Sequence, residues 1–267
     1  MSLSKGSGPF GEDRLGTGNY RIDSPKHILH FDPSPKRVRA FLAGEVIVDS
    51  IQAKLLHETG HLPVYYFPAE DVRAEFLETS DHATHCPFKG DASYRSVVVR
   101  DKRAQDAMWM YENPNEEASF LRDHAAFYFD RMDSWFEEDE EIFVHPRDPY
   151  SRIDILASSR HVRISLEGQD LAETDRPVLL FETSLPTRYY FSKEDVRMDL
   201  LEVSGHVTEC AYKGRPVHYS APELGDSGKH IAWCYEDPRP EAEKVKGFVA
   251  FYNERVDVEI DGRKIER

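Results

Sequence analysis

The sequence repeats itself after 124 residues, and this duplication constrains the fold more than any other feature. Residues 38–133 align without a gap with residues 162–257, and about a third of the aligned positions are identical. Two copies of roughly 100 residues are typical of tandem globular domains, not of a solenoid of short repeats. We therefore expect a flexible tail over residues 1–18, a first domain over 19–143, a linker over 144–151 and a second domain over 152–267.

One motif lies at residues 77–90 and returns at residues 201–214. Its positions 78, 80, 82, 84 and 86 are identical in the two copies, whereas 79, 81, 83, 85 and 87 all differ. Side chains of a β-strand alternate between two faces, so the pattern predicts a strand with one retained face. We expect that face to point into the interior or into a pocket between positions 80 and 86. It carries Glu78, Ser80, His82, Thr84 and Cys86 in the first copy and Glu202, Ser204, His206, Thr208 and Cys210 in the second.

Each copy is otherwise built from short β-like segments. Residues 64–67 and 188–191 are typical of matched aromatic strands, and Gly44 and Gly168 mark a shared turn. Short strands at close spacing, separated by turn residues, indicate a mainly-β barrel or sandwich with small helices in each copy.

The composition bears on the partners that the chain can have. The net charge of −15 argues against binding to nucleic acid or to an anionic membrane. The three cysteines are too few and odd in number for a disulfide framework, and residues 1–18 hold no apolar segment of a signal peptide. We therefore expect a cytoplasmic protein without a nucleic-acid or membrane partner, and the oligomeric state stays open.

Several motifs resemble one known family. They are Tyr65-Tyr66-Phe67-Pro68 with Asp71-Val72-Arg73, Thr84-x-Cys86-Pro87-x-Lys89-Gly90-x-Ala92-x-Tyr94, and Trp109-x-Tyr111-Glu112-x-Pro114. The combination is similar to the family called domain of unknown function 427, and it covers most of residues 37–136 and 160–264. The resemblance implies a tandem-domain member with a mainly-β, Mss4-like architecture, and it implies no established activity.

A nucleotidyltransferase-like label attached to this family does not suit the chain. Phosphoryl transfer needs metal-binding carboxylates, and the sequence has no Gly-Ser helix start coupled to an Asp-x-Asp pair. The second copy departs from the family pattern at Ala211, which replaces Pro87, and over residues 216–219. If only one domain is active, we expect it to be the first.

Cys86 and His82 are the candidate catalytic residues, as a thiol nucleophile and its base. Four residues along a strand span about 13 Å, which is too far for a direct hydrogen bond unless a bulge intervenes. An imidazole from another strand, such as His57 or His61, would then be needed. The alternative is that Cys86 is a small buried apolar side chain, so whether the protein is an enzyme stays open.

His206, Cys210 and Cys234 of the second copy are residue types that bind zinc. Cys234 aligns with Met110, however, and neither copy contains a Cys-x-x-Cys pair. We therefore expect no metal site, and no cofactor is indicated.

The motif ends in a lysine followed by a glycine, which are Lys89 and Gly90 in the first copy. Glycine permits a positive φ and close approach of a ligand, and lysine supplies a charge. Together with Arg39, Lys89 is expected to attract an anionic or strongly polar group at the end of the motif strand. The alternative is that Arg39 pairs with Glu78 while Lys89 stays in solvent.

Two classes of function follow from these features. In the first, a pocket beside the motif strand binds, or binds and transforms, a small polar or anionic molecule. In the second, the chain is a non-enzymatic protein-interaction module without such a pocket. A deep pocket touching His82 and Lys89 favours the first class, and a filled barrel with an exposed apolar patch favours the second. The remaining candidate ligand-binding residues are Tyr65, Ser80, Thr84, Tyr94, Trp109 and Tyr111 in the first copy and Arg163, His206, Cys210, Lys213, Gly214 and Trp233 in the second.

Overall fold

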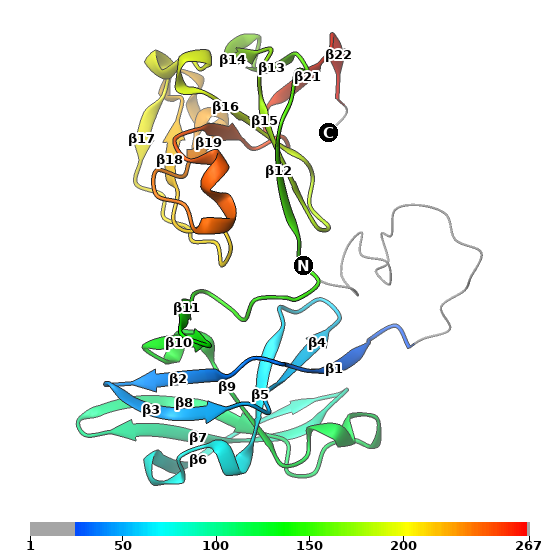
Figure 1. Cartoon of the computed structure of the whole chain (residues 1–267), viewed down its shortest axis with the longest axis vertical. Helices are drawn as coiled ribbons and strands as arrows, with labels where there is room; N and C mark the ends of the chain where they lie inside the picture. Colours follow the sequence, from blue (N-terminus) through cyan, green and yellow to red (C-terminus); the bar gives the residue numbers. More distant parts are fainter. Residues whose placement is uncertain (1–24, 266–267) are drawn as a thin grey trace. The chain divides into compact units, whose positions relative to one another are not determined.

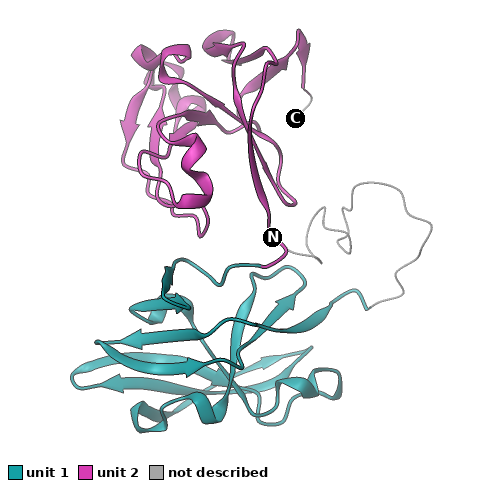
Figure 2. Cartoon of the chain, viewed as in Figure 1, with its two compact units in different colours: residues 1–148 teal, residues 149–267 magenta. Residues whose placement is uncertain are grey.

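The computed structural model describes residues 25–265, and the tail expected over residues 1–18 lies outside this range. The chain divides into two compact units, residues 1–148 and residues 149–267 (Figure 2). The division falls within the segment 144–151 that the sequence marks as a linker.

The first unit contains two antiparallel sheets (Figure 1). The seven-stranded sheet has the order β1-β4-β5-β9-β8-β7-β6, and the four-stranded sheet has the order β11-β10-β2-β3. The strands are β1 (Leu29–Pro33), β2 (Val38–Leu42), β3 (Glu45–Ser50), β4 (Lys54–Glu58), β5 (Val64–Pro68), β6 (Leu77–Cys86), β7 (Gly90–Val99), β8 (Lys102–Met110), β9 (His124–Phe127), β10 (Ser134–Glu137) and β11 (Glu140–Ile142). The short helices are η1 (Ala69–Asp71), η2 (Ala74–Phe76), η3 (Glu116–Leu121) and η4 (Phe129–Arg131).

The second unit repeats this topology (Figure 1). Its sheets have the orders β12-β15-β16-β20-β19-β18-β17 and β14-β13-β21-β22. The strands are β12 (Ile153–Ala157), β13 (Val162–Leu166), β14 (Gln169–Thr174), β15 (Val178–Glu182), β16 (Arg188–Phe191), β17 (Glu202–Ser204), β18 (Val217–Ser220), β19 (Ala232–Cys234), β20 (Val249–Phe251), β21 (Asp257–Ile260) and β22 (Arg263–Lys264). The helices are η5 (Lys193–Asp195), η6 (Met198–Leu200), η7 (Pro222–Gly228) and η8 (Pro240–Val245).

The seven-stranded sheet of the first unit is apolar on both faces. The alternate residues of β2 from Val38 to Leu42 are buried and pack with Phe67 of β5 in a core between the two sheets. Tyr66, the neighbour of Phe67, belongs to a second cluster, which includes Leu121 of η3. Successive side chains of a strand point to opposite faces, so the second cluster lies on the far side of the same sheet. That side carries the ion pair and most of the aromatic residues of the candidate site.

The prediction of two similar, mainly-β domains with small helices is confirmed. Among the described residues, the paired sheets of each unit form a sandwich-like arrangement and do not close into a barrel. The predicted aromatic strands at 64–67 and 188–191 correspond to β5 and β16. No helix between residues 25 and 265 is long and apolar enough to cross a membrane.

Candidate functional site

The motif strand of the first unit, β6, is an edge strand of the seven-stranded sheet. Its pairing with β7 is interrupted between Thr79 and Ala83, which is a bulge of the kind that often occurs at sheet edges. The expectation that positions 80 to 86 point into the interior is wrong for His82 and Thr84, which are exposed. An edge strand has a neighbour on one side only, so its side chains have less protein to cover them.

The retained face of β6 nevertheless meets a specific neighbour. The Thr84 hydroxyl forms a hydrogen bond of 2.9 Å with the Tyr94 hydroxyl, and the His82 ring lies 4.4 Å from the Tyr94 ring, centre to centre. Ser80 donates a hydrogen bond to the Asp106 carboxylate. Two of the retained side chains, His82 and Thr84, therefore contact Tyr94, which belongs to the aromatic cluster.

In the second unit the motif is mostly irregular, since β17 ends at Ser204. The Thr208 hydroxyl bonds to His218 at 2.7 Å, which repeats the contact between Thr84 and Tyr94. The His206 ring lies 4.7 Å from the rings of both His218 and His230. The motif therefore makes equivalent contacts without a continuous strand.

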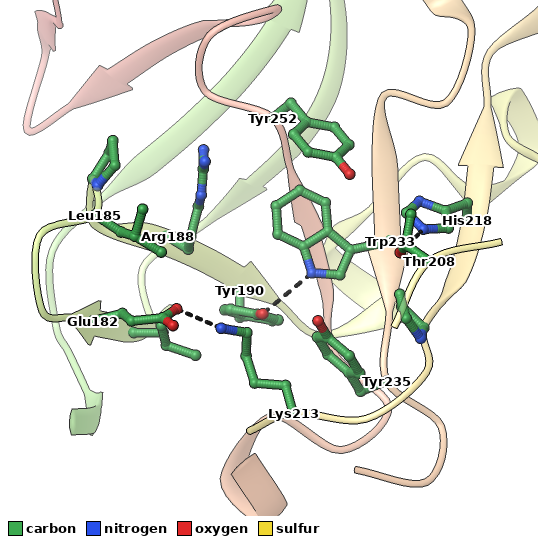
Figure 3. Close-up of a pocket in the computed structure, with 13 residues that line it drawn as sticks. Glu182, Leu185, Arg188, Tyr190, Thr208, Lys213, His218, Trp233, Tyr235 and Tyr252 are labelled. Atoms are coloured by element: carbon green, nitrogen blue, oxygen red, sulfur yellow. Dashed lines mark hydrogen bonds and ion pairs between the residues drawn. The ribbon is translucent and has the colours of Figure 1, made fainter. Parts of the chain in front are cut away.

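A buried ion pair lies beside this motif in each unit. Lys89, in the turn after β6, donates a hydrogen bond to the Glu58 carboxylate at the end of β4, and both side chains are buried. Burial opposes ionisation of Glu58, but hydrogen bonds from Lys89 and His27 outweigh it, so the pKa of Glu58 is lowered. The alternative in which Lys89 stays in solvent is therefore wrong. Lys213 and Glu182 form the same pair in the second unit (Figure 3).

Glycine follows the lysine because the backbone has a positive φ there and runs close to a neighbouring segment. Gly90 has φ +100°, and a Cβ atom there would lie 3.3 Å from the backbone oxygen of Asn113 and the backbone nitrogen of Asn115. Gly214 has φ +91°, with its nearest neighbours at 3.6 Å. The glycine thus allows the lysine turn to pack against the chain that follows β8, or β19 in the second unit.

An aromatic wall faces the ion pair. The Trp109 indole donates a hydrogen bond of 3.2 Å to the Tyr66 hydroxyl, and Trp233 makes the same bond to Tyr190 (Figure 3). Burial raises the pKa of Tyr111 well above its ordinary value, so its hydroxyl stays protonated at neutral pH.

These groups line a pocket in each unit. The pocket of the first unit has a volume of about 640 Å³, and that of the second about 180 Å³ (Figure 3). Seven aligned positions are identical in the two linings: Leu56 and Leu180, Glu58 and Glu182, Tyr66 and Tyr190, Lys89 and Lys213, Trp109 and Trp233, Tyr111 and Tyr235, and Tyr128 and Tyr252. At another position that lines both pockets, the first has Tyr94 and the second has His218.

The structure brings seven of the seventeen proposed site residues to these pockets. Those that line a pocket are Tyr65, Lys89, Tyr94, Trp109 and Tyr111 in the first unit and Lys213 and Trp233 in the second. The lining residues do not include Ser80, His82, Thr84, Cys86, Gly90, His206, Cys210 or Gly214. Cys86 is half-buried and packs against the cluster that contains Tyr66.

Arg39 and Arg163 lie on the four-stranded sheets, apart from these pockets. The Arg39 guanidinium pairs with Asp139 at 2.9 Å, and Arg163 makes two hydrogen bonds to Asp170. The expected pair of Arg39 with Glu78 is wrong, because Glu78 pairs with Arg103 instead. Arg39 and Lys89 therefore hold separate carboxylates and do not form a joint anion site.

Sequence reasoning missed two lining residues that carry much of the site's chemistry: Glu58 and Tyr128. Both are identical in the second copy, as Glu182 and Tyr252, and this identity is the signal that could have found them. Glu58 ends β4 and Tyr128 follows β9, so their proximity is not visible in the sequence.

The described residues hold no group of three or more His, Cys, Asp or Glu side chains placed to bind a metal ion. Burial raises the pKa of the Cys234 thiol to about 12, so that thiol is protonated at neutral pH. The lining groups instead offer hydrogen bonds, one compensated ion pair and aromatic faces.

The two units, each with the same paired sheets and the same pocket, define a mainly-β protein made of a duplicated small domain. The chain belongs to the family described as domain of unknown function (DUF427), whose model matches it twice, at residues 30–138 and 154–262. The resemblance seen in the motifs is thereby confirmed. A search of curated proteins found no match to the chain.

Proposed function

We propose that the protein binds a small polar organic molecule in the aromatic pocket of its first unit. One observation carries this proposal. The ion pair and four aromatic side chains that line this pocket, Tyr66, Trp109, Tyr111 and Tyr128, recur at the matching positions of the second unit, around a pocket there as well.

The ion pair supports a binding role because burying two charges in a pocket wall costs more free energy than burying apolar side chains there. Removing Lys89 and Glu58 from water costs several kcal/mol per ion, and apolar side chains of similar volume often stabilise a fold as well or better. A paired ammonium and carboxylate in a pocket wall can donate to and accept from a polar ligand. The pair also ties the end of β4 to the turn after β6, which keeps these groups in place.

The aromatic side chains support an organic ligand with a flat or apolar face. Pockets for such ligands have volumes of roughly 300–1,000 Å³ and combine aromatic walls with a few polar groups. The pocket of the first unit, at about 640 Å³, lies within that range, and that of the second lies below it. The net charge of −15 supports a small molecule over nucleic acid.

Binding, not a reaction, is what the geometry supports. The candidate nucleophile Cys86 and base His82 lie outside the lining of the pocket. No reaction is therefore assigned to the site.

Native mass spectrometry of the freshly purified full chain tests the proposal. We expect a small molecule of defined mass bound to the wild type and absent, or much reduced, in Trp109→Ala. Arg39→Ala is a matched control, because Arg39 is bound to Asp139 on the other sheet and its loss should leave the bound molecule unchanged. Equal retention in Trp109→Ala and the wild type would contradict the proposal. A chain that carries no molecule and is not stabilised by any member of a metabolite library would favour the interaction-module alternative.

A further inference from the structure

The linings of the two pockets differ most in charge at one aligned position. The first pocket has Val64 there, and the second has Arg188. The Arg188 guanidinium lies 5.7 Å from the centre of the Trp233 ring (Figure 3). It also makes two hydrogen bonds, of 2.7 and 2.8 Å, to the Glu254 carboxylate. The second pocket therefore contains a planar cation that belongs to the protein itself.

This arginine covers the indole of the second pocket. Trp233 is only 7 % exposed, whereas Trp109, its counterpart beside Val64, is half-buried. The first pocket is also the larger, at about 640 Å³ against about 180 Å³, and its lining extends further, over Trp135 and residues 144–146. A valine side chain is too short to cover the indole as Arg188 does, so Trp109 keeps more of its surface open.

The acidic partner of the cation is present in the first unit even though the arginine is not. Asp130 aligns with Glu254, is exposed, and has no ion pair with any residue in the described part of the chain. Arg131, which lies next to Asp130, does not replace Arg188, because the second unit has a counterpart of Arg131 in addition to Arg188. Arg131 donates to the backbone oxygen of Gln105, and its counterpart Arg255 donates to the backbone oxygens of Ser227 and His230.

We propose that the pocket of the first unit takes a ligand with a planar cationic group, a guanidinium or an amidinium. The group would stack on Trp109 and pair with Asp130, in the position that Arg188 takes in the second unit. This inference rests on the proposed binding function of the pocket and names the chemical class of its ligand.

Stacking, ion pairing and the net charge of the chain all favour a planar cationic ligand. Planar cations stack on indole rings and pair with carboxylates through two parallel hydrogen bonds, and both interactions strengthen when water is excluded. Lys89 does not repel the cation strongly, because its charge is compensated by Glu58. The net charge of −15 adds a general attraction for cations.

Three probes of nearly the same shape isolate the charge: benzamidinium, benzamide and benzoate. Calorimetric titration of the full chain should give one benzamidinium site, about tenfold tighter than any benzamide binding, with benzoate weaker than both. Trp109→Leu and Asp130→Asn should each weaken benzamidinium about five- to tenfold. Val64→Arg should abolish the site by supplying the cation from the protein.

The second unit provides the matched controls. Glu254→Gln should leave benzamidinium binding to the first unit unchanged. Arg188→Val should open the second pocket, so that the number of benzamidinium sites rises from one to two. This gain of a site keeps the test decisive even if Val64→Arg perturbs folding.

Equal binding of benzamide and benzamidinium, preferential binding of benzoate, or no binding of any probe would each overturn the inference. Benzamide or benzoate binding that Trp109→Leu removes would show a working pocket of another specificity, and the proposed function would stand. A benzamidinium site that is unaffected by Trp109→Leu and Val64→Arg would lie elsewhere on the chain and would also overturn the inference.

Discussion

Lys89 and Glu58 are both buried and hydrogen-bonded to one another, so each charge depends on the other for its stability. The pair joins the turn after β6 to the end of β4, which are 31 residues apart in the chain. Lys213 and Glu182 repeat the relationship in the second unit. A repeated buried pair on a pocket wall has consequences for stability that can be measured.

Lys89→Met should destabilise the first unit by about 3 kcal/mol, because it leaves the Glu58 carboxylate buried with only His27 as a partner. The double variant Glu58→Leu with Lys89→Met should lose less, since no charge remains buried. Urea denaturation followed by circular dichroism measures both. Lys102→Met is the control: its pair with Asp133 is half exposed, so the change should stay below about 1 kcal/mol.

The same pair predicts a pH dependence. The pKa of Glu58 is lowered from its ordinary value of 4.5, so the carboxylate binds protons more weakly in the folded state than in the unfolded state. Its contribution to the free energy of unfolding is therefore fully present above that value and is lost as the pH falls through the lowered pKa. Unfolding measured from about pH 7 to about pH 3 should show this loss in the wild type. A double variant, Glu58→Leu with Lys89→Met, that loses as much stability as the wild type over this range would contradict the assignment to Glu58.

Gly90→Ala should destabilise the first unit by about 2 kcal/mol or more, because φ is +100° and the new Cβ atom would press on the backbone of Asn113 and Asn115. Gly44→Ala separates the two causes. Gly44 also has a positive φ, +80°, but nothing lies within 4 Å of the added atom, so only the conformational cost of about 1 kcal/mol applies. Equal losses for the two variants would show that the contact with the chain after β8 contributes nothing.

Features that depend on local or repeated sequence could be predicted. The 124-residue offset predicted two units of one fold, and the aromatic runs predicted β5 and β16, because strand alternation and repetition are visible in the chain itself. The identity of Lys89 and Lys213 also pointed to the pocket lining, although for a different reason than the one the structure reveals.

Features that depend on strand order could not be predicted. The position of β6 at a sheet edge follows from which strands pair, and no residue of the motif records it. The partner of Lys89 likewise depends on which turn and strand are neighbours in the fold, so the sequence did not reveal Glu58 as that partner. For the same reason the predicted partner of Arg39 was wrong. The error that followed was to expect that the retained face of the motif strand would also be a buried face.

The tryptophan–tyrosine hydrogen bonds of the two pockets are equal in length but lie in different surroundings. Trp109 and Trp233 each donate to a tyrosine hydroxyl at 3.2 Å, but Trp233 is buried and Trp109 is half-buried. Replacing the tyrosine by phenylalanine leaves the indole N–H without its acceptor, and an unpaired donor costs about 1–3 kcal/mol when water cannot reach it.

Tyr190→Phe should therefore destabilise the second unit by an amount toward the upper end of that range. Tyr66→Phe should destabilise the first unit by less than about 1 kcal/mol, because water in the wider pocket can accept a hydrogen bond from Trp109. Urea denaturation of each variant, followed by tryptophan fluorescence, gives the two losses. Arg188→Val in the Tyr190→Phe background is the matched control, since it opens the pocket beside Trp233. If exclusion of water is the cause, this change should recover part of the stability lost in Tyr190→Phe. An unchanged or larger loss of stability would show that packing of the tyrosine ring causes the difference between the two units.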